Sequence, residues 1–567
     1  MTDALMPLYS RLAEITTLSV AEVEEHLTQP PKPELGDYAF PCFPLAKVLK
    51  KSPAQIAGEL AAKLEPDDVI TEAKAAGPYI NIRLNRQPIV DTVLTAVRAR
   101  GAAYGGTPDQ GKTVVIDYSS PNMAKPFHVG HLSSTIIGGS LSKLYDFAGW
   151  NVIRVNHLGD WGTPIGMQLA AFQRWGNEDE LAANPIEHVL VLYQRFHREK
   201  EDDATLMEEA REWFRKLETG DEEARSFWQN IRSHSIEALE KTYARLGVGF
   251  DYYHGEAFYE DMLDDTLSTI SDAHITRESD GALIVPLEDK GMETPLIVRK
   301  SDGGTTYATR DLAAAMFRQR EHAFDRCLYV VARDQELHFQ QLFATLELMK
   351  FDWADRVQHV KFGHVHGMST RKGGAILLAE LIDRATDKVS EVITDNQESI
   401  FGEVPAEEIA AVAEAVGIGA IIFGTLNRKR NKDIEFSWDN ALTFNGETGP
   451  YVQYAHARLC SILRKANRDI PESPDFTLLS HDAEWALVKQ LSRFPGEITA
   501  ACEACEPSFI ARYLLDLSQA LTKFYDQCRV LGDDENLTGA RLALVDCVRE
   551  VIHTGLGLLC IRAPERM

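Results

Sequence analysis

The hydrophobic and polar positions along the chain change period several times, and each change predicts a different element. The apolar residues of GPYINIRLN, residues 77–85, recur at every second position, which predicts a strand. TVVIDYS (113–119) and NVIRVN (151–156) are short β-branched runs, separated by a helical segment that ends near Gly149. Because a strand, a helix and a second strand form a βαβ unit, we predict that a parallel sheet begins here.

The α/β rhythm is then interrupted and later returns. Residues from about 175 to 300 are read as a helical insertion between two halves of one sheet. Strand patterns reappear at 326–332 and 359–365, with a helix to Met349 between them. Beyond Ala406 nearly every segment has helical spacing, as in the apolar series Leu514, Leu517, Leu521, Phe524 and Cys528. The last 150 or so residues are therefore predicted to form a helical bundle.

These patterns predict an α/β multidomain protein. An N-terminal α/β domain is expected first, and a parallel-sheet core with its helical insertion follows it. A further helical region and an all-helical C-terminal domain complete the chain. The predicted boundaries of these four parts are 1–106, 107–365, 366–444 and 445–567.

Composition narrows the class of protein. The 567 residues are 44% hydrophobic and 25% charged, as in globular proteins, which excludes wholesale disorder. The net charge of −26 argues against non-specific nucleic-acid binding but leaves room for local basic patches. The longest apolar run, Ala415–Leu426, is shorter than the ~20 residues that span a membrane. Asp3, Arg11 and Glu14 interrupt any signal-peptide pattern, so we expect a cytoplasmic protein with no membrane partner.

The strongest chemical signal directly follows the first strand of the predicted parallel sheet, in SSPNMAKPFHVGHLSSTIIGG, residues 119–139. His128 and His131 are three positions apart, so they share a face at a helix start. Gly130 leaves room for a flat base to lie against the backbone. Nucleotides bind at the carboxyl ends of strands in open parallel sheets, and imidazoles there can donate to phosphate oxygens. Two capping or surface histidines are the alternative, which the order of strand, loop and helix disfavours.

This segment resembles the nucleotide-binding signature of class I aminoacyl-tRNA synthetases, and its SPNxAKPFHVGHLxSTIIG form resembles the arginyl-tRNA synthetases. Further blocks with the same resemblance run from end to end of the chain, namely 36–47, 156–166, 301–315, 367–373, 445–458 and the terminal APERM. The resemblance implies a class I Rossmann-type catalytic core. It also implies an N-terminal domain that contacts the outer corner of tRNA and a C-terminal helical domain that binds the anticodon.

The reaction implied by the resemblance joins L-arginine to tRNA-Arg at the expense of ATP. Arginyl-adenylate and pyrophosphate form first, with tRNA already bound, and the arginyl group then passes to the 3′-terminal ribose. Mg²⁺ is expected to travel with the phosphates of ATP. No structural metal is expected, because Cys502 and Cys505 supply only two of the four ligands that zinc needs. We also expect a monomer.

An arginine pocket has to recognise a planar cation with five donors, which carboxylates do best. Glu256 and Asp311 would supply negative charge, and Tyr307 would supply an apolar wall with a hydroxyl. Asn122 and Gln335 would bind the backbone groups of the amino acid through their side-chain amides. For Glu256 an ordinary surface acid is the alternative. By resemblance the pocket consists of Asn122, Glu256, Tyr307, Asp311 and Gln335.

The second phosphate loop is where the sequence departs from the class pattern K-M-S-K. Gly367 and Thr370 occupy the two lysine positions, so the charge that stabilises pyrophosphate must come from elsewhere. Family resemblance favours Lys125 as the catalytic replacement, while Arg371 and Lys372 are the competing source. The residues expected to bind ATP are Gly130, His128, His131, Met368, Ser369, Arg371 and Lys372.

Two segments, 428–432 and 451–458, contain residue types that commonly bind RNA. Tyr451, Tyr454 and Arg458 lie at i, i+3 and i+7, where they offer stacking platforms and a cation for unstacked anticodon bases. The resemblance adds Tyr525 and Met567 to this surface. The basic run 428–432 is either an RNA-phosphate contact or a solvated basic helix face.

Two rival functions follow from the same residues. A non-catalytic RNA-binding paralogue is supported only by the altered GMST loop, residues 367–370. An enzyme for another amino acid would keep the chemistry, but the paired acids Glu256 and Asp311 disfavour an apolar substrate.

Overall fold

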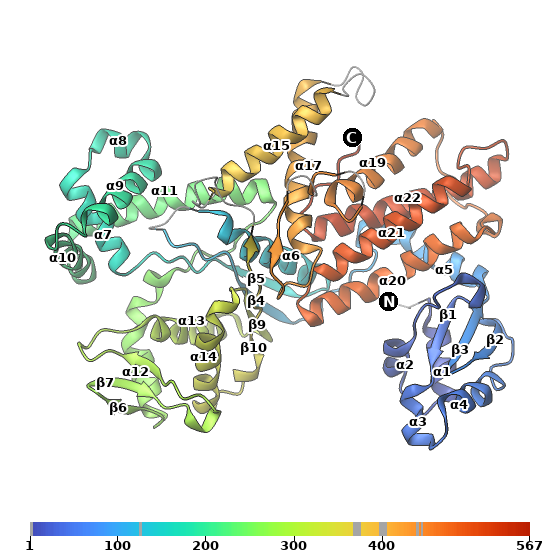
Figure 1. Cartoon of the computed structure of the whole chain (residues 1–567), viewed down its shortest axis with the longest axis horizontal. Coiled ribbons are helices and arrows are strands. Elements are labelled where there is room, and N and C mark those ends of the chain that lie inside the picture. The colour runs from blue at the N-terminus through green and yellow to red at the C-terminus, as the bar shows by residue number, and fades with distance from the viewer. Residues whose placement is uncertain (1–3, 124–126, 367–375, 396–404, 438–440, 444–445) are drawn as a thin grey trace. The chain divides into compact units, whose positions relative to one another are not determined.

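The computed structural model of the protein describes residues 4–123, 127–366, 376–395, 405–437, 441–443 and 446–567 (Figure 1). Its internal contacts divide the chain into two compact units. The first unit consists of Met1–Gly105, Arg458–Gly496 and Leu515–Thr554. The second unit consists of Gly106–Ala457, Glu497–Leu514 and Gly555–Met567. The predicted boundaries at 106, 365 and 444 stay predictions.

The N-terminal part of the first unit has the predicted α/β character. Its antiparallel sheet has the order β1 (Tyr38–Pro41), β3 (Tyr79–Leu84) and β2 (Ile70–Ala76). Strand β3 is the one predicted from its period of two, and its alternate residues Ile80 and Ile82 are fully buried. The helices of this part are α1 (Met6–Ile15), α2 (Val20–His26), α3 (Phe43–Leu49), α4 (Pro53–Ala61) and α5 (Arg86–Arg100).

A four-stranded parallel sheet forms the core of the second unit, in the order β10 (Val357–His359), β9 (Arg326–Tyr329), β4 (Thr113–Asp117) and β5 (Asn151–Val155). Helix α6 (Leu132–Phe147) connects β4 to β5, which confirms the predicted βαβ unit. The chain passes from β4 to β5 on one side and later returns to β9 on the other. The carboxyl end of β4 is therefore a topological switch point, where open α/β sheets bind ligands.

The strand predicted over 359–365 is wrong in its placement. Helix α14 (Glu336–Leu348) ends as expected, but β10 ends at His359, where the predicted strand begins. Phe362 still forms a bridge with Ala332, but the Gly363 amide donates to the Arg430 carbonyl at 2.8 Å, and a Cβ atom at Gly363 would lie 2.6 Å from the backbone oxygen of Lys432. A second strand, β11 (Val365–His366), pairs with β12 (Ile434–Glu435) instead. The predicted strand therefore overlaps only the end of β10 and the start of β11, which belong to different sheets, and residues 360–364 lie in neither strand.

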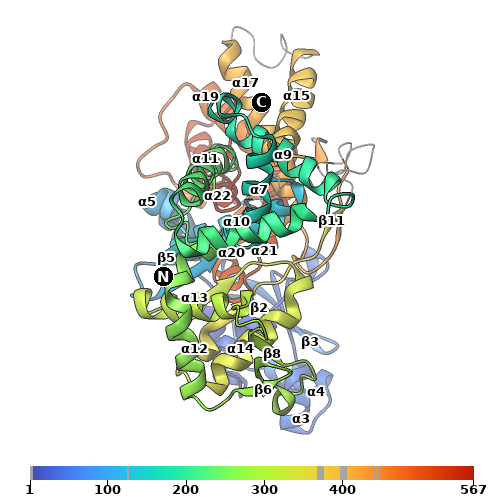
Figure 2. The same cartoon turned by 90° about the vertical axis from the view of Figure 1, so that its left-hand side faces the viewer.

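The predicted insertion is helical only in its first part. Helices α7, α9, α10 and α11 pack together, as Figure 2 shows. The prediction is wrong beyond residue 276, where three short strands form an antiparallel sheet. The turn between the first two strands contains Asp280 and Gly281, both with positive φ, and Asp-Gly is a strong hairpin signal. The elements are α7 (Thr163–Trp175), α8 (Glu178–Ala183), α9 (Pro185–Glu199), α10 (Thr205–Thr219), α11 (Glu222–Leu246), α12 (Leu263–Asp272), β6 (Arg277–Ser279), β7 (Ala282–Val285) and β8 (Leu296–Arg299).

The C-terminal region is helical, as predicted. The apolar series that begins at Leu514 and ends at Cys528 is buried along α21 and just beyond it. The boundary between the two units falls inside four of these helices, α19 to α22. The helices after residue 376 are α15 (Leu378–Asp395), α17 (Ala406–Leu426), α19 (Gly449–Ala466), α20 (Asp482–Ala504), α21 (Ser508–Gln527) and α22 (Glu535–Leu558).

Helix α17 is long and apolar enough to cross a membrane, with a mean hydropathy of 2.0 over its most apolar stretch. However, 72% of that stretch is buried inside the protein. Gly417 lets α17 approach the backbone of α15 at Ala385, and Gly419 contacts the side chain of Gln453. The apolar surface of α17 is thus covered by neighbouring helices, as in the core helix of a globular domain.

Candidate active site

The loop that follows β4 at the switch point has an unusual backbone. Ser119 and Ser120 have φ values of 69° and 45°, which non-glycine residues adopt rarely. Hydrogen bonds hold this conformation, since the Ser119 amide donates to Ser134 Oγ at 2.9 Å and the Ser120 amide donates to Asn156 Oδ1 at 3.2 Å. Strained residues of this kind persist where the surrounding structure fixes them, typically at functional sites.

The insertion supports the same loop through a buried tyrosine. Tyr243 of α11 places its hydroxyl 2.8 Å from Ser119 Oγ and accepts a hydrogen bond from Asn156 Nδ2 at 3.0 Å. Burial raises the pKa of Tyr243 to about 12, so the hydroxyl stays neutral at physiological pH. The inserted helices therefore help to build the site at the end of the sheet.

His128 and His131 come together at the start of α6, as their spacing predicts. Their ring centroids are 4.4 Å apart, and a short 3₁₀ turn, Val129–His131, links them. The Gly130 amide donates to His128 Nδ1 at 3.0 Å. Because Nδ1 accepts this bond, the proton of the neutral ring is assigned to Nε2, which makes Nε2 a donor. The hydrogen bond thus fixes the tautomer of His128, with Nε2 as the donor atom of the ring.

Gly130 is required by this geometry. A Cβ atom at this position would lie 2.6 Å from Cε1 of His128, closer than side-chain atoms approach. Any other residue would displace the imidazole from its bond to the backbone. Gly130 is also exposed, so its backbone is open to a planar group, as the sequence predicts.

The loop after β5 contacts both the loop after β4, which leads to the two signature histidines, and the acidic residues. Asn122 forms a backbone bridge with Gly159, where a Cβ atom would lie 3.2 Å from Asn122 Cα. The Glu256 amide donates to the Leu158 carbonyl at 2.9 Å. In the same loop, His157 Nε2 lies 3.7 Å from Asp311 Oδ1. The structure thus brings Asn122, Glu256 and Asp311 to one region.

Asp311 lies on α13 (Tyr307–His322) and has a second imidazole partner. His338 Nε2 lies 2.6 Å from Asp311 Oδ2. Burial alone would raise the pKa of Asp311, but the His338 hydrogen bond, together with the charge of either imidazole when that ring is protonated, lowers it below its ordinary value. Asp311 is therefore ionised at neutral pH. Neither His157 nor His338 is among the site residues predicted from the sequence, although His157 lies in the block 156–166 and His338 is three residues after Gln335.

Neighbouring carboxylates are neutralised by arginines, whereas the two pocket acids are not. Arg232 pairs with Asp160 at 2.9 Å, Arg310 with Glu260, and Arg318 with Asp117 at 2.7 Å. Within the described parts of the chain, neither Asp311 nor Glu256 forms an ion pair with lysine or arginine. This leaves two carboxylates whose charge is available to a cationic ligand, as an arginine pocket requires.

Keeping Glu256 ionised in the folded protein lowers the free energy of unfolding. Burial raises its pKa above the ordinary value and Asp311 adds to the rise, while His157 and Arg310 oppose it. The folded state therefore disfavours ionised Glu256 relative to the unfolded chain. This penalty is present at pH 7 and disappears below the ordinary glutamate pKa, where the carboxyl is protonated in both states.

Replacing Glu256 by glutamine is expected to leave the melting temperature at pH 7 equal to, or above, that of the unchanged protein, because it removes the buried charge. The gain should shrink as the pH is lowered towards 4. Thermal unfolding of both proteins, without substrates, at several pH values tests this. A Glu256→Gln protein that melts several degrees lower at pH 7 would show that an internal cation already stabilises the carboxylate.

The remaining pocket residues lie at the starts of two helices. Tyr307 is the first residue of α13 and is 62% exposed, so its ring is open to a ligand. Its ring centroid lies 4.9 Å from that of His338. Gln335 immediately precedes α14 and is exposed. Lys125 and the residues of the second phosphate loop, Met368, Ser369, Arg371 and Lys372, lie outside the described residues.

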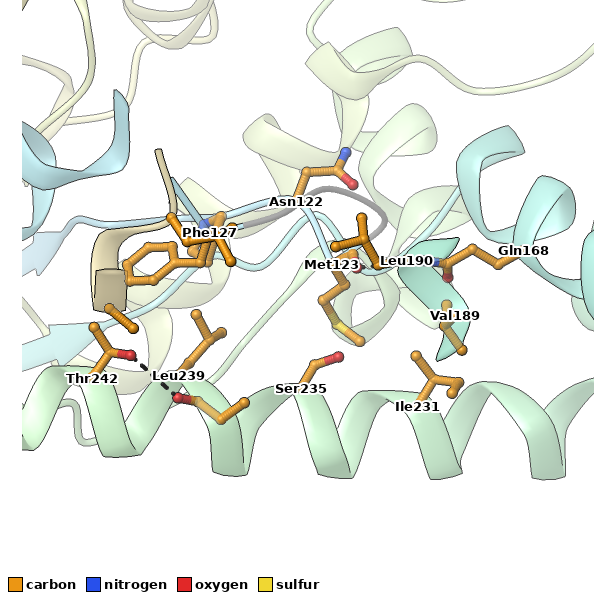
Figure 3. Close-up of a pocket in the computed structure, with 14 residues that line it drawn as sticks. Asn122, Met123, Phe127, Gln168, Val189, Leu190, Ile231, Ser235, Leu239 and Thr242 are labelled. Carbon is orange, nitrogen blue, oxygen red and sulfur yellow. Dashed lines mark hydrogen bonds between the residues drawn. The ribbon is translucent and has the colours of Figure 1, made fainter. Parts of the chain in front are cut away.

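A mainly apolar cavity of about 260 Å³ lies beside the signature loop (Figure 3). Met123 and Phe127 form one wall, α11 forms another, and the Asn122 amide points away from α11. Because charged groups are costly to bury in such surroundings, the guanidinium and phosphates are expected elsewhere. The lining residues are Pro121, Asn122, Met123, Phe127, Gln168, Val189, Leu190, Ile231, Ser235, Ala238, Leu239, Thr242, Leu377 and Ala379.

The predicted anticodon residues are divided between the two units. In the second unit Tyr454 is 42% exposed, Tyr451 is half-buried, and Met567 packs against an apolar cluster of α15 and α17. In the first unit the Arg458 guanidinium lies 3.3 Å from the ring centroid of Tyr525. Tyr454 and Tyr525 are thus exposed aromatic rings suited to stacking.

Two weaker sequence features have structural explanations. The basic run 428–432 is a loop after α17, so its interpretation as a helix face is wrong. Within it Arg430 donates to the carbonyls of Cys505 and Lys361 at 2.9 and 2.6 Å. Cys502 and Cys505 are buried, and burial raises the pKa of Cys502 to about 12. No cluster of three metal-ligating side chains occurs among the residues that the structure describes.

The chain was compared with known proteins, and the matches extend over nearly its whole length. Family models match residues 8–84 (arginyl tRNA synthetase N terminal domain), 93–438 (tRNA synthetases class I (R), catalytic domain) and 452–567 (DALR anticodon binding domain). The arginine–tRNA ligase of Alkaliphilus metalliredigens is 44% identical over 559 residues, covering 98% of each chain. Arginine–tRNA ligase 1 of Bacillus thuringiensis is 45% identical and covers 100% of each.

Solved structures give the same result. The arginyl-tRNA synthetase of Thermus thermophilus superposes with a TM-score of 0.84 at 26% identity, covering 100% of each chain. The Plasmodium falciparum structure has a TM-score of 0.83 at 24% identity and supports the fold alone. The predicted class I parallel-sheet fold, with its N-terminal domain and helical C-terminal domain, is confirmed. By its sequence and its fold, this chain belongs to the arginyl-tRNA synthetase family of class I aminoacyl-tRNA synthetases.

Proposed function

We propose that the protein is an arginine–tRNA ligase, which uses ATP to attach L-arginine to tRNA-Arg. The observation that carries this proposal is the pair of carboxylates, Asp311 and Glu256, that form no ion pair with lysine or arginine among the described residues, while the acids around them are paired with arginines. An amino acid with a neutral side chain has only its α-ammonium to offer and would leave one of the two charges uncompensated, which is costly in a half-buried site. Arginine supplies a guanidinium and an α-ammonium.

In the first step the arginine carboxylate attacks the α-phosphorus of ATP. One P–O bond forms and the bond to the pyrophosphate oxygen breaks, giving arginyl-adenylate and pyrophosphate. His128 Nε2, with His131 beside it, is placed to donate to phosphate oxygens as negative charge develops there. No covalent nucleophile is needed, so catalysis depends on positioning and charge stabilisation.

The charge that stabilises the leaving pyrophosphate is assigned by resemblance. Lys125 precedes His128 by three residues on the same connection, so its ammonium is our preferred source. Arg371 and Lys372 are the alternative. Mg²⁺ is expected to bind the phosphate oxygens of ATP, and no separate structural metal is part of the proposal.

In the second step the terminal ribose hydroxyl of tRNA attacks the arginyl carbonyl and AMP leaves. The match of residues 452–567 to an anticodon binding domain supports recognition of tRNA by this region. Tyr454 and Tyr525 are the exposed rings there, and Tyr451, Arg458 and Met567 complete the proposed surface. We further propose that tRNA must bind before adenylate forms, and that the protein acts as a cytoplasmic monomer.

Tyr454→Ala is expected to raise the KM for tRNA-Arg about 5- to 150-fold, because stacking of one base on an aromatic ring contributes ~1–3 kcal/mol. The KM values for arginine and ATP should be unchanged. Aminoacylation at varied tRNA concentration measures the effect. Tyr193→Ala, which alters a buried tyrosine of the insertion, serves as the control for general damage. An unchanged KM for tRNA in Tyr454→Ala would remove this residue from the anticodon surface.

Exchange of labelled pyrophosphate into ATP, with and without tRNA-Arg, tests the proposed activity. We expect exchange that depends on arginine and on tRNA. A non-catalytic paralogue would bind tRNA and show no exchange under either condition, and that result would overturn the proposal. Exchange with arginine but without tRNA would retain the enzyme and refute only the order of binding.

A further inference from the structure

The carboxylate that faces the arginine side chain needs a fixed direction as well as a charge. A carboxylate reads a guanidinium through two parallel hydrogen bonds, which form only at a defined orientation. Asp311 has no arginine or lysine partner in the described part of the chain, so something else must orient it. Its two oxygens face two histidines.

His338 is the closer of the two partners and comes from a different element. It lies on the first turn of α14, three residues after Gln335, and its Nε2 is 2.6 Å from Asp311 Oδ2. The ring is 8% exposed and also packs on Tyr307, with centroids 4.9 Å apart. The His338 side chain thus contacts both Asp311 and Tyr307, and it lies three residues after Gln335 in the sequence.

The hydrogen bond also indicates which form of the ring is present. Ionised Asp311 only accepts hydrogen bonds, so the proton on His338 is assigned to Nε2. His338 Nδ1 is buried and has no hydrogen-bond partner among the described residues. A second proton there would bury an N–H group without an acceptor. A neutral ring is therefore the form that fits its surroundings.

A neutral donor differs from an arginine in its effect on the carboxylate. Arg232 neutralises Asp160 in the same region, and Asp160 then has no net charge to offer a substrate. A neutral imidazole fixes the direction of the carboxylate and leaves its charge in place. His157, with Nε2 at 3.7 Å from Oδ1, can restrain the other oxygen through a weaker contact.

We propose that His338 is a positioning residue for substrate recognition, which orients Asp311 by a neutral hydrogen bond so that the carboxylate keeps its charge for the guanidinium of arginine. His157 assists from the opposite oxygen. This inference rests on the proposed arginine–tRNA ligase activity and adds to it residues that do not themselves contact the reacting atoms.

Two substitutions of similar chemistry test the proposal. His338→Gln places an amide N–H where Nε2 lies, whereas His338→Asn is also a neutral amide but is too short to reach Asp311. We expect His338→Asn to raise the KM for arginine about 10- to 100-fold, the effect of losing a hydrogen bond to a charged group. The kcat and the KM for ATP should stay within about threefold, and His338→Gln should restore the KM for arginine to within about threefold of the unchanged protein.

The controls separate this proposal from a structural role and from the proposed function. His322→Asn changes a histidine at the other end of α13 and should leave the KM for arginine unchanged. If His338→Asn does not fold, His338→Met, which fills a similar volume without a donor, replaces it. An unchanged KM in the donor-free variant, or equal damage in Gln and Asn variants, overturns the role of His338. Failure of the unchanged protein to charge arginine would instead overturn the proposed function, and this proposal with it.

Discussion

A protein carrying His128→Asn is expected to form arginyl-adenylate about 100- to 1,000-fold more slowly than the unchanged protein, with its fold intact. Removing one preorganised donor from the site where charge develops typically costs ~2.7–4 kcal/mol of the activation barrier. Asparagine keeps an acceptor for the Gly130 amide, as His128 Nδ1 does, and asparagine caps helices well. It lacks a donor at the position of Nε2, so the substitution removes only the phosphate contact.

Single-turnover adenylate formation with tRNA present measures this rate, and thermal unfolding checks the fold. His234→Asn, on an exposed part of the insertion helix α11, is the matched control and should be fully active. A His128→Asn protein that activates arginine at the normal rate would mean that Nε2 does not meet a phosphate. Loss of activity together with a large fall in melting temperature would show a structural role instead.

Asp311→Asn is expected to raise the KM for arginine about 30-fold or more. Truncating one member of a buried charge pair typically costs 2–5 kcal/mol, and each ~1.4 kcal/mol is a factor of ten. Asparagine preserves the shape of Asp311 and an oxygen that can accept from His338, so the loss is mainly that of charge. The KM for ATP should change little, since the phosphates are held by other residues.

Citrulline provides the complementary measurement, because it matches arginine in shape but its side chain carries no positive charge. It should compete poorly with arginine for the unchanged protein, since the carboxylate that faces the guanidinium would remain unpaired. In Asp311→Asn the discrimination between the two should narrow. Equal competition by citrulline and arginine in the unchanged protein would mean that these two acids do not form the pocket.

The sequence predicts elements well where one local pattern decides them. Strand β3 follows from its period of two, and the series from Leu514 to Cys528 follows the apolar face of α21. Two errors arose where the chain pairs with another segment or turns locally. Residues 365–366 pair with β12, about 70 residues away, instead of continuing the parallel sheet, and the Asp280–Gly281 turn starts a small sheet inside a region predicted to be helical.

The sequence predicts candidate residues for the site but not the side chains that support them. Histidine spacing alone predicts that His128 and His131 share a face, and family resemblance supplies Asp311 and Glu256. The partner of Asp311 could not be predicted in this way, because His338 is 27 residues away on another helix and nothing in its local sequence pattern indicates the contact. Contacts of this kind depend on how α13 and α14 pack, which the sequence of either helix does not state.

Charging of tRNA-Arg with each of the twenty amino acids, one at a time, tests the central claim most directly. The claim is that Asp311 and Glu256, which form no ion pair with lysine or arginine among the described residues, select arginine for transfer to tRNA, while His128 and His131 bind the phosphates of ATP. The predicted result is efficient, ATP-dependent charging with arginine, little or none with lysine, and none with the neutral amino acids. Charging with a neutral amino acid at a rate comparable to arginine, or charging with none of the twenty, would contradict the account.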